Sequence, residues 1–229
     1  MKSKIIKVKT KSKNYEVHIG PDLISNLNLI LKKKKIIFSK CLIVIDNKIP
    51  KKFIKLIIKN FKGRKFYTLS FNANEKNKNY LSINKIHNAL FNKNFYRDDC
   101  VISFGGGITG DVVGYAASTF KRGIKFINIP STLLAQVDSS IGGKTGINNK
   151  FGKNLVGSFY QPDLVISDIN LLNSLPKREI ICGYAEILKS SLIDSKTNFI
   201  YLDKNLNKIL NLKESFIMNA ILNSCLLKK

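Results

Sequence analysis

The hydrophobic positions along the chain repeat with two periods, which predicts alternating strands and helices. Residues 5–8 and 15–19 alternate between apolar and polar positions, as in an opening β-hairpin. Apolar runs predict further strands at residues 41–46, 65–70, 101–104, 126–130 and 164–166. Helices are predicted from Gly20-Pro21-Asp22 onward, over residues 53–61 and 81–91, and in the Ala/Gly-rich stretch after residue 107. Continuous apolar strands between amphipathic helices favour an α/β fold, with a parallel sheet covered on both faces.

The pattern changes after Pro176, where the apolar residues keep only helical spacing. Residues 180–192 and 206–227 are each predicted to form a helix. We therefore expect a boundary near Pro176, with an α/β domain over residues 1–176 and the beginning of an all-helical domain over residues 177–229.

The charge is strongly positive but does not point to nucleic acid. The net charge is +24, yet only four of the 39 basic residues are arginine, and the lysines are spread along the chain beside many Asn and Ile residues. Dispersed charge without an RNA-binding motif disfavours a nucleic-acid-binding protein. The composition instead resembles drift toward AT-rich codons.

Membrane, secretory and disulfide classes are also disfavoured. No apolar run approaches about 18 residues, so no membrane span is expected. The N-terminus reads as a strand without a signal peptide, so a cytoplasmic protein is expected. The four cysteines are far apart and form no C-x-x-C, which argues against a disulfide framework or a cysteine zinc site.

Gly105, Gly107 and Gly110 fit the pattern G-x-G-x-x-G between a predicted strand and a predicted helix. Such glycines let backbone N–H groups approach a pyrophosphate, and the following helix N-terminus favours its negative charge. Asp46 ends an earlier strand and could accept hydrogen bonds from a ribose, or could instead cap a helix. Because this acid precedes the glycine loop, the chain reads as a variant, Rossmann-like nucleotide fold.

Two further polar segments could contact an anion. Ser131 and Thr132 follow a predicted strand, where they could cap a helix, contact a ligand, or do both. Gly143-Lys144-Thr145 resembles the end of a P-loop, but Asp138 stands where that motif needs a glycine and no predicted strand leads into it. Lys144, Lys153 and the neighbouring Asn154 could hold a phosphate or carboxylate, although solvated loop lysines are the alternative.

Metal-ligand candidates are few. Glu186 could be one carboxylate ligand, or it could form a surface ion pair with Lys189 on the same helix. His18 and His87 have no ligand spacing and are expected to be structural or surface histidines.

Residues 105–194 resemble the 3-dehydroquinate synthase family through four sequence blocks in the same order and spacing. The blocks are GGGITGDVVGYAAS, KRGIKFINIPSTLLAQVDSSIGGKTGIN, FGKNLVGSFYQP and GYAEILK. A weaker resemblance covers the rest, where Asp46 and Glu75-x-x-Lys78 match family positions but Asn74 replaces a glycine and Asn79-Tyr80 is unlike the family.

The resemblance implies a carbon–oxygen lyase that forms 3-dehydroquinate and phosphate from 3-deoxy-arabino-heptulosonate 7-phosphate, the second step of the shikimate pathway. NAD would oxidise the C5 hydroxyl transiently, which makes the C6 proton acidic enough for phosphate elimination. The same hydride would then be returned, so NAD would act as a catalyst. The resemblance also implies a homodimer, with no nucleic-acid or membrane partner.

The resemblance assigns roles to individual positions. NAD would be held by Asp46, Glu75, Lys78, Gly107, Ile108, Thr109, Gly110, Asp111, Ser131 and Thr132, with Lys144, Lys153, Leu171, Leu172, Asn173 and Ser174 on its nicotinamide side. The catalytic and substrate-binding residues would be Lys144, Asp138, Asn154, Lys189 and Arg122, the last reaching the phosphate from the neighbouring subunit. Glu186 would be one ligand of a divalent metal, zinc or cobalt.

The chain departs from the family beyond Lys229, where the helical domain normally continues and supplies two histidine ligands. A fragment, a truncated product and one half of a split enzyme remain open, and we expect residues 1–229 alone to turn over poorly. A polyol or glycerol-phosphate dehydrogenase shares the architecture but lacks the VDSS-x-GGKT-x-x-N and GKN-x-x-G blocks. An inactive NAD-binding remnant is the other alternative.

Overall fold

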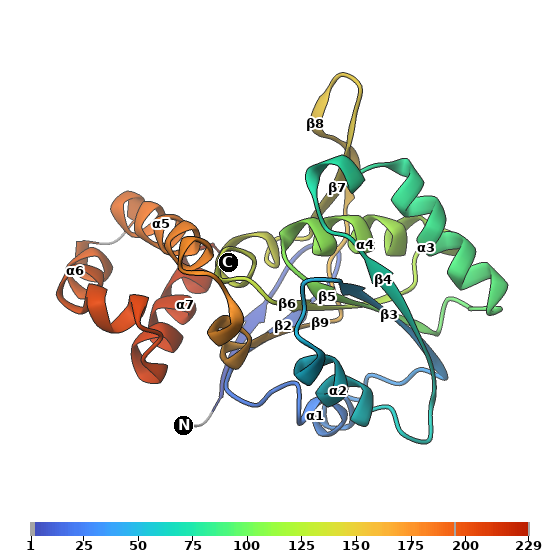
Figure 1. Ribbon diagram of the computed structural model, residues 1–229, viewed down its shortest axis with the longest axis horizontal. Coiled ribbons are helices and arrows are strands. Elements are labelled where there is room, and N and C mark those ends of the chain that lie inside the picture. The colour runs from blue at the N-terminus through green and yellow to red at the C-terminus, as the bar shows by residue number, and fades with distance from the viewer. Residues whose placement is uncertain (1–2, 195, 229) are drawn as a thin grey trace.

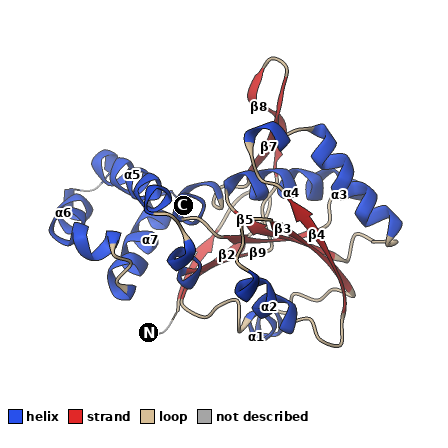
Figure 2. Ribbon diagram, viewed as in Figure 1, coloured by secondary structure: helices blue, strands red, loops and turns tan. Residues whose placement is uncertain are grey.

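The computed structural model describes residues 3–194 and 196–228, and these form an α/β unit followed by helices (Figures 1 and 2). The strands of the main sheet are β1 (Lys4–Val8), β2 (Tyr15–Gly20), β3 (Lys40–Asp46), β4 (Lys65–Phe71), β5 (Cys100–Gly105), β6 (Lys125–Pro130) and β9 (Leu164–Asp168). The helices around this sheet are α1 (Leu27–Lys33), α2 (Lys51–Lys59), α3 (Tyr80–Asn92) and α4 (Gly107–Thr119). Among the described helices, none is long and apolar enough to span a bilayer.

The main sheet has the order β1-β2-β9-β6-β5-β3-β4 within the described residues. All neighbouring strands are parallel except β1 and β2, which pair as the predicted hairpin. After β3 the chain moves to β4 at one edge, and it then returns to β5 on the other side of β3. The strand order therefore reverses between β3 and β5. The predicted α/β class is confirmed.

Helices cover both faces of the sheet (Figure 1). Helices α1 and α2 bury Leu27 and Phe53 in one core, which also contains Ile43 of β3. Helices α3 and α4 bury their apolar residues in a second core, which contains Leu42 and Val44 of the same strand. Successive side chains of β3 thus enter opposite cores, which explains why the strand is apolar at consecutive positions.

The predicted start of the first helix was wrong. Residues 21–26 form turns, and α1 begins at Leu27. Asp22 has a φ of 56°, which is outside the right-handed helical region. The Gly-Pro-Asp signal therefore marks a turn that leads into the helix.

A second sheet was not predicted. Strands β7 (Lys144–Asn149) and β8 (Gly152–Phe159) form an antiparallel hairpin that projects from the α3 and α4 side of the molecule (Figure 1). Most of β8 is exposed or only partly buried, so its sequence lacks the apolar alternation of a half-buried strand. Ile147 of β7 anchors the hairpin in the core beside α4.

The C-terminal part consists of α5 (Lys177–Asp194), α6 (Lys196–Leu210) and α7 (Glu214–Lys228). The prediction of a single helix over residues 206–227 was wrong. Helix α6 ends at Leu210, and Leu212, which precedes α7, adopts a φ of 53°. Ile221 of α7 lies in one core with Val17 of β2, so these helices pack directly against the α/β part. The domain boundary near Pro176 stays a prediction.

Candidate functional site

The carboxyl ends of β3 and β5 meet where the strand order reverses, and both predicted nucleotide segments lie there. Asp46 is the last residue of β3 and Gly105 is the last residue of β5. A Cβ atom on Gly105 would stand 2.9 Å from the Cβ of Asp46, so the two backbones approach closely. Ligands of open α/β sheets bind in the crevice at such a reversal.

The glycine loop presents an uncapped helix N-terminus. Helix α4 begins at Gly107, and within the described part of the chain no side chain caps it at Gly106. Its first N–H groups are therefore available for an anion. A Cβ on Gly105 would also stand 2.4 Å from Oγ1 of Thr109, a buried hydroxyl for which the described residues provide no hydrogen-bond partner. Small residues and an unpaired polar atom at this point fit the close approach of a pyrophosphate, so the residues present fit NAD.

Asp46 does not cap the next helix, since Pro50 occupies that position. Its Oδ1 accepts a hydrogen bond from the backbone N–H of Lys48 at 3.1 Å. Burial raises the pKa of this carboxyl above its ordinary value, and the nearby backbone donors oppose part of that rise. A buried carboxylate at a strand end retains the capacity to accept hydrogen bonds from a ribose.

Ser131 and Thr132 lie beside the glycine loop. Thr132 Oγ1 accepts a hydrogen bond from the Ala135 N–H at 3.2 Å, which confirms the predicted capping role. The Ser131 N–H donates to the Gly105 carbonyl at 2.8 Å and fixes the end of β6 against the loop.

A hollow of about 520 Å³ lies next to the glycine loop and is lined by several residues predicted to bind the cofactor or the substrate. Asp111 of α4, Lys144 of β7 and Asn154 of β8 line it together with Asp138. Asp138 belongs to the π-helix η3 (Ala135–Ser139), a rare form that is frequent at functional sites. Helix α4, which begins in the glycine loop, and the lysine-bearing hairpin thus both contribute residues to one hollow.

Lys78 links the segment that follows β4 to two residues that line this hollow. Its buried side chain donates to Asp111 Oδ2 at 2.6 Å and to Asn154 Oδ1 at 2.5 Å. Burial raises the pKa of the Asp111 carboxyl, and the Lys78 ammonium opposes that rise. Glu75, which begins the short helix η1 (Glu75–Asn77), accepts a hydrogen bond from the Asn148 side chain at 2.8 Å.

Lys228 is a further charged residue of the hollow that was not predicted from the sequence. This residue, in the last turn of α7, lines the hollow and forms an ion pair with Asp138. Burial lowers its pKa. The only sequence signal was its place one residue beyond a predicted helix, which does not indicate what the side chain faces.

Other predicted residues lie outside this hollow. Lys153 of β8 is exposed, and Leu171, Leu172, Asn173 and Ser174 belong to the short helix η4 (Ile169–Ser174) after β9. Arg122 lines a separate hollow of about 460 Å³ with Arg97, Lys13 and Lys125. Within one chain, Arg122 is therefore not brought to the Asp138 site. Lys121 and Arg122 both have positive φ values, 47° and 66°.

The described residues do not form a metal site. No group of three or more His, Cys, Asp and Glu side chains is close enough together in this part of the chain. Glu186 of α5 forms an ion pair with Lys189, as the simpler sequence interpretation predicted. The residues present therefore do not fit a complete zinc or cobalt site.

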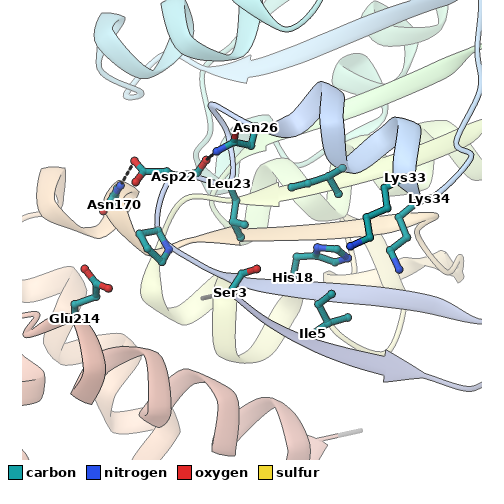
Figure 3. Close-up of a pocket in the computed structure, with 12 residues that line it drawn as sticks. Ser3, Ile5, His18, Asp22, Leu23, Asn26, Lys33, Lys34, Asn170 and Glu214 are labelled. Carbon is teal, nitrogen blue, oxygen red and sulfur yellow. Dashed lines mark hydrogen bonds between the residues drawn. The ribbon is translucent and has the colours of Figure 1, made fainter. Parts of the chain in front are cut away.

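The two histidines have structural roles. His18 Nε2 donates to Glu16 Oε2 at 2.9 Å, and Lys34 Nζ bonds the same carboxylate at 2.5 Å. His18 lines a hollow of about 540 Å³ where it lies beside Lys33 and Lys34, while Asp22 bonds Asn170 toward the other end (Figure 3). None of the predicted site residues lines this hollow. His87 on α3 bonds the Ala116 carbonyl at 3.0 Å.

The family of this chain follows from its similarity to known proteins. The family model described as 3-dehydroquinate synthase N-terminal matches residues 68–182, about half of the chain. The chain belongs to the 3-dehydroquinate synthase family. The matched segment contains the glycine loop, the π-helix and the β7–β8 hairpin.

Curated relatives of the 3-dehydroquinate synthase family match nearly the whole chain. A 3-dehydroquinate synthase of Pelagibacter ubique (strain HTCC1062) is 58% identical over 224 residues, which cover 98% of this chain and 61% of that protein. A 3-dehydroquinate synthase of Buchnera aphidicola subsp. Cinara cedri (strain Cc) is 40% identical, over 97% of this chain and 61% of that protein. The chain thus spans about three fifths of the length of these family members.

A solved structure of another synthase has the same fold. The 2-epi-5-epi-valiolone synthase ValA of Streptomyces hygroscopicus subsp. jinggangensis 5008, solved with NAD+ and Zn2+ bound, has a TM-score of 0.85 and is 26% identical. The match covers 96% of this chain and 61% of ValA. This chain and ValA therefore share the α/β part and the helices that follow it.

Proposed function

We propose that this chain provides the NAD- and phosphate-binding part of a 3-dehydroquinate synthase. The substrate would be 3-deoxy-arabino-heptulosonate 7-phosphate, and the products 3-dehydroquinate and phosphate. One observation carries the proposal: Asp111, in the first turns of the glycine-loop helix, also lines the hollow of Lys144 and Asn154. A cofactor on the loop and a sugar phosphate in the hollow would therefore be neighbours.

The nucleotide would lie across the reversal between β3 and β5. In this proposal Asp46 accepts hydrogen bonds from the ribose, and the N–H groups of residues 107–111 hold the pyrophosphate. The remaining proposed contacts to NAD are Glu75, Lys78, Ser131, Thr132, Lys144, Lys153, Leu171, Leu172, Asn173 and Ser174. When bound, NAD supplies a hydride acceptor for a substrate carbinol carbon.

The substrate would be held by charged groups around the 520 Å³ hollow. Lys144 and Asn154 would bind the phosphate, as a point charge and a hydrogen-bond donor. Asp138, ion-paired with Lys228, would accept hydrogen bonds from ring hydroxyls, with Lys189 addressing the ring from α5. The ion pair fixes the charges of Asp138 and Lys228 before the substrate binds. The ring hydroxyls would therefore be oriented with little reorganisation of the protein.

Glu186 is the one residue of the described chain that we propose as a metal ligand. The described residues do not complete a metal site. The relatives extend well beyond the matched part, and ligands for zinc or cobalt would have to come from residues other than those described.

The proposal includes a homodimer. Arg122 lies in its own hollow, away from Asp138, so it can reach a substrate phosphate only from a second copy. Sedimentation equilibrium at micromolar concentration tests this, with a dimer expected. A monomer whose phosphate binding is unaffected by Arg122→Ala would contradict it.

The function is tested by phosphate release from the heptulosonate 7-phosphate. The purified chain is assayed with NAD and zinc, alone and with the unmatched C-terminal part of the Pelagibacter relative supplied as a separate polypeptide. We expect NAD to bind the chain alone, and phosphate release without net NADH in the supplemented sample. Net NADH accumulation would indicate a dehydrogenase. Absence of NAD binding to the chain would contradict the proposal outright.

A further inference from the structure

Two loops that are distant in the sequence are joined at the edge of the proposed site. One is residues 74–79, which contains Glu75 and Lys78, and the other is the turn region of the β7–β8 hairpin. They meet at Asn148 near the end of β7, the last residue of the VDSS-x-GGKT-x-x-N block, for which the resemblance gives no role of its own.

Every polar group of Asn148 except its carbonyl takes part in this junction. The side-chain Nδ2 donates to Glu75 Oε2 at 2.8 Å, and the backbone N–H donates to the Lys78 carbonyl at 2.8 Å. The side-chain Oδ1 accepts from the backbone N–H of Asn154 at 3.0 Å. One residue thus holds the 74–79 loop and the start of the phosphate-binding segment together.

The local backbone shows why Asn148 is placed to do this. The pairing of β7 with β8 shifts its register between Ile147 and Asn149. Such an irregularity turns the residue within it away from the regular ladder. Asn148 therefore bonds the 74–79 loop through its backbone N–H, a group that a regular hairpin would use internally or leave to solvent.

The partner residue, Asn154, has a backbone that requires support. Its φ is +58°, in the left-handed region that non-glycine residues adopt at a cost. Its N–H is held by Asn148 and its side-chain Oδ1 by Lys78 at 2.5 Å. Lys78 belongs to the 74–79 loop, and Asn148 is itself bonded to that loop, so the orientation of Asn154 depends on the loop.

We propose that Asn148 is a positioning residue that couples nucleotide binding to phosphate binding. The proposal rests on the proposed function, in which Glu75 and Lys78 face NAD and Asn154 faces the phosphate. Ordering of the 74–79 loop by NAD stabilises the Asn148 bonds and with them the phosphate-binding conformation of Asn154. By linkage, phosphate must then favour NAD by the same factor.

The test measures this coupling in the whole chain. NAD affinity is measured by calorimetry, and inorganic phosphate is titrated while the backbone amide resonances of Lys144 and Asn154 are followed. In the wild type we expect NAD to tighten phosphate binding by about fivefold. Asn148→Ala should reduce this factor to about one, and exchange of the Asn154 amide hydrogen should become about tenfold faster.

Two further variants separate positioning from hairpin stability. Asn149→Ala removes an acceptor for the Phe151 and Gly152 N–H groups inside the hairpin turn, but no bond to the 74–79 loop. It should keep the coupling. Asn148→Asp retains the acceptor for Asn154 but sets a carboxylate against Glu75. It should keep Asn154 protected, lose the coupling at neutral pH and regain it in acid, when one carboxyl is protonated.

The outcomes distinguish this proposal from the function on which it rests. A wild type that binds neither NAD nor phosphate contradicts the proposed function, and the exchange rate of the Asn154 amide then decides the role of Asn148. Unchanged exchange in Asn148→Ala overturns the proposal. It is equally overturned if both ligands bind and the coupling is the same in Asn148→Ala as in Asn149→Ala.

Discussion

Lys228 forms an ion pair with Asp138, although 90 residues separate them in the sequence. Cys225, one turn earlier on α7, donates its thiol to the carbonyl of Gln136 at 3.4 Å. The side chain of Gln136 in turn donates to the carbonyls of Pro130 and Asp168, at the ends of β6 and β9. The π-helix that carries Asp138 is therefore held between the sheet and α7, and the helical part contributes a charge to the hollow of the α/β part.

Replacing Lys228 should weaken anion binding in that hollow. Lys228→Met leaves the carboxylate of Asp138 without its cation, beside Lys144. Because both side chains are about one-third exposed, we expect a modest loss, about threefold in the affinity for inorganic phosphate, with NAD affinity unchanged. Phosphate titration followed by NMR measures this.

The matched control is Lys204→Met, which removes an exposed lysine on α6 that does not line the hollow. An equal loss of phosphate affinity in both variants would show that the effect is due to net charge, and the local role of Lys228 would be refuted.

The glycine loop permits a sharp stability comparison between neighbouring positions. A Cβ on Gly105 would lie 2.4 Å from Thr109 Oγ1 and 2.7 Å from Thr109 Cβ, in the interior of the loop. Gly105→Ala should therefore lower the free energy of unfolding by about 1–3 kcal/mol and weaken NAD binding. Urea denaturation and calorimetry measure the two effects.

Gly106→Ala is the control, since its Cβ would meet Thr132 Cγ2 at 3.3 Å and only one methyl group would need to shift. It should cost less than about 1 kcal/mol of unfolding free energy. A Gly105→Ala protein as stable as Gly106→Ala would show that the loop relaxes around the added methyl group, and the expected strain at Gly105 would be refuted.

The sequence was most informative where burial on both faces leaves a strong signal. β3, β5 and β6 are buried at every or nearly every position, so their apolar runs predicted the strands and the parallel sheet. The glycine loop and Asp46 could be placed because parallel strands end at one edge of the sheet.

The rest depended on contacts that no local pattern encodes. The β7–β8 hairpin is polar and glycine-rich because much of it faces solvent, so its lysines appeared to lie in loops. Lys78 reads as a surface residue in an Asn/Lys-rich stretch, yet it is buried against Asp111 and Asn154, which come from distant segments. The pairing of Lys228 with Asp138 depends on how α7 packs on the π-helix.

Acid should affect stability and cofactor binding in opposite directions through Asp46. Burial raises the pKa of this carboxyl above 3.8. Between 3.8 and the raised value, the folded chain binds more protons at Asp46 than the unfolded chain. This group therefore makes the free energy of unfolding decrease as the pH rises through that window. NAD affinity should increase over the same range, because only the carboxylate accepts both ribose hydrogen bonds.

Urea denaturation and calorimetry of the wild type and Asp46→Ser, from about pH 4 to about pH 7, measure the two slopes. The difference in slope between the proteins reports on Asp46, whereas a constant offset reports only the lost bond from the Lys48 N–H. Parallel curves for both quantities would show that Asp46 does not titrate in this window.

The chain should prefer NAD to NADP. The carboxylate of Asp46 lies at the end of β3 beside the glycine loop, where it would face the 2′-phosphate of NADP. Repulsion between these charges in a partly buried site should give at least about a tenfold preference for NAD, or about 1.4 kcal/mol. Asp46→Ser should reduce the preference, because it weakens the binding of NAD and removes the repulsion of NADP.

Asp98→Ser is the control for net charge, because Asp98 is fully exposed and lines the Arg122 hollow instead. Calorimetric titration of both cofactors into the three proteins measures the ratio. Equal affinities in the wild type, or the same ratio in Asp46→Ser as in the wild type, would show that the ribose does not lie against β3.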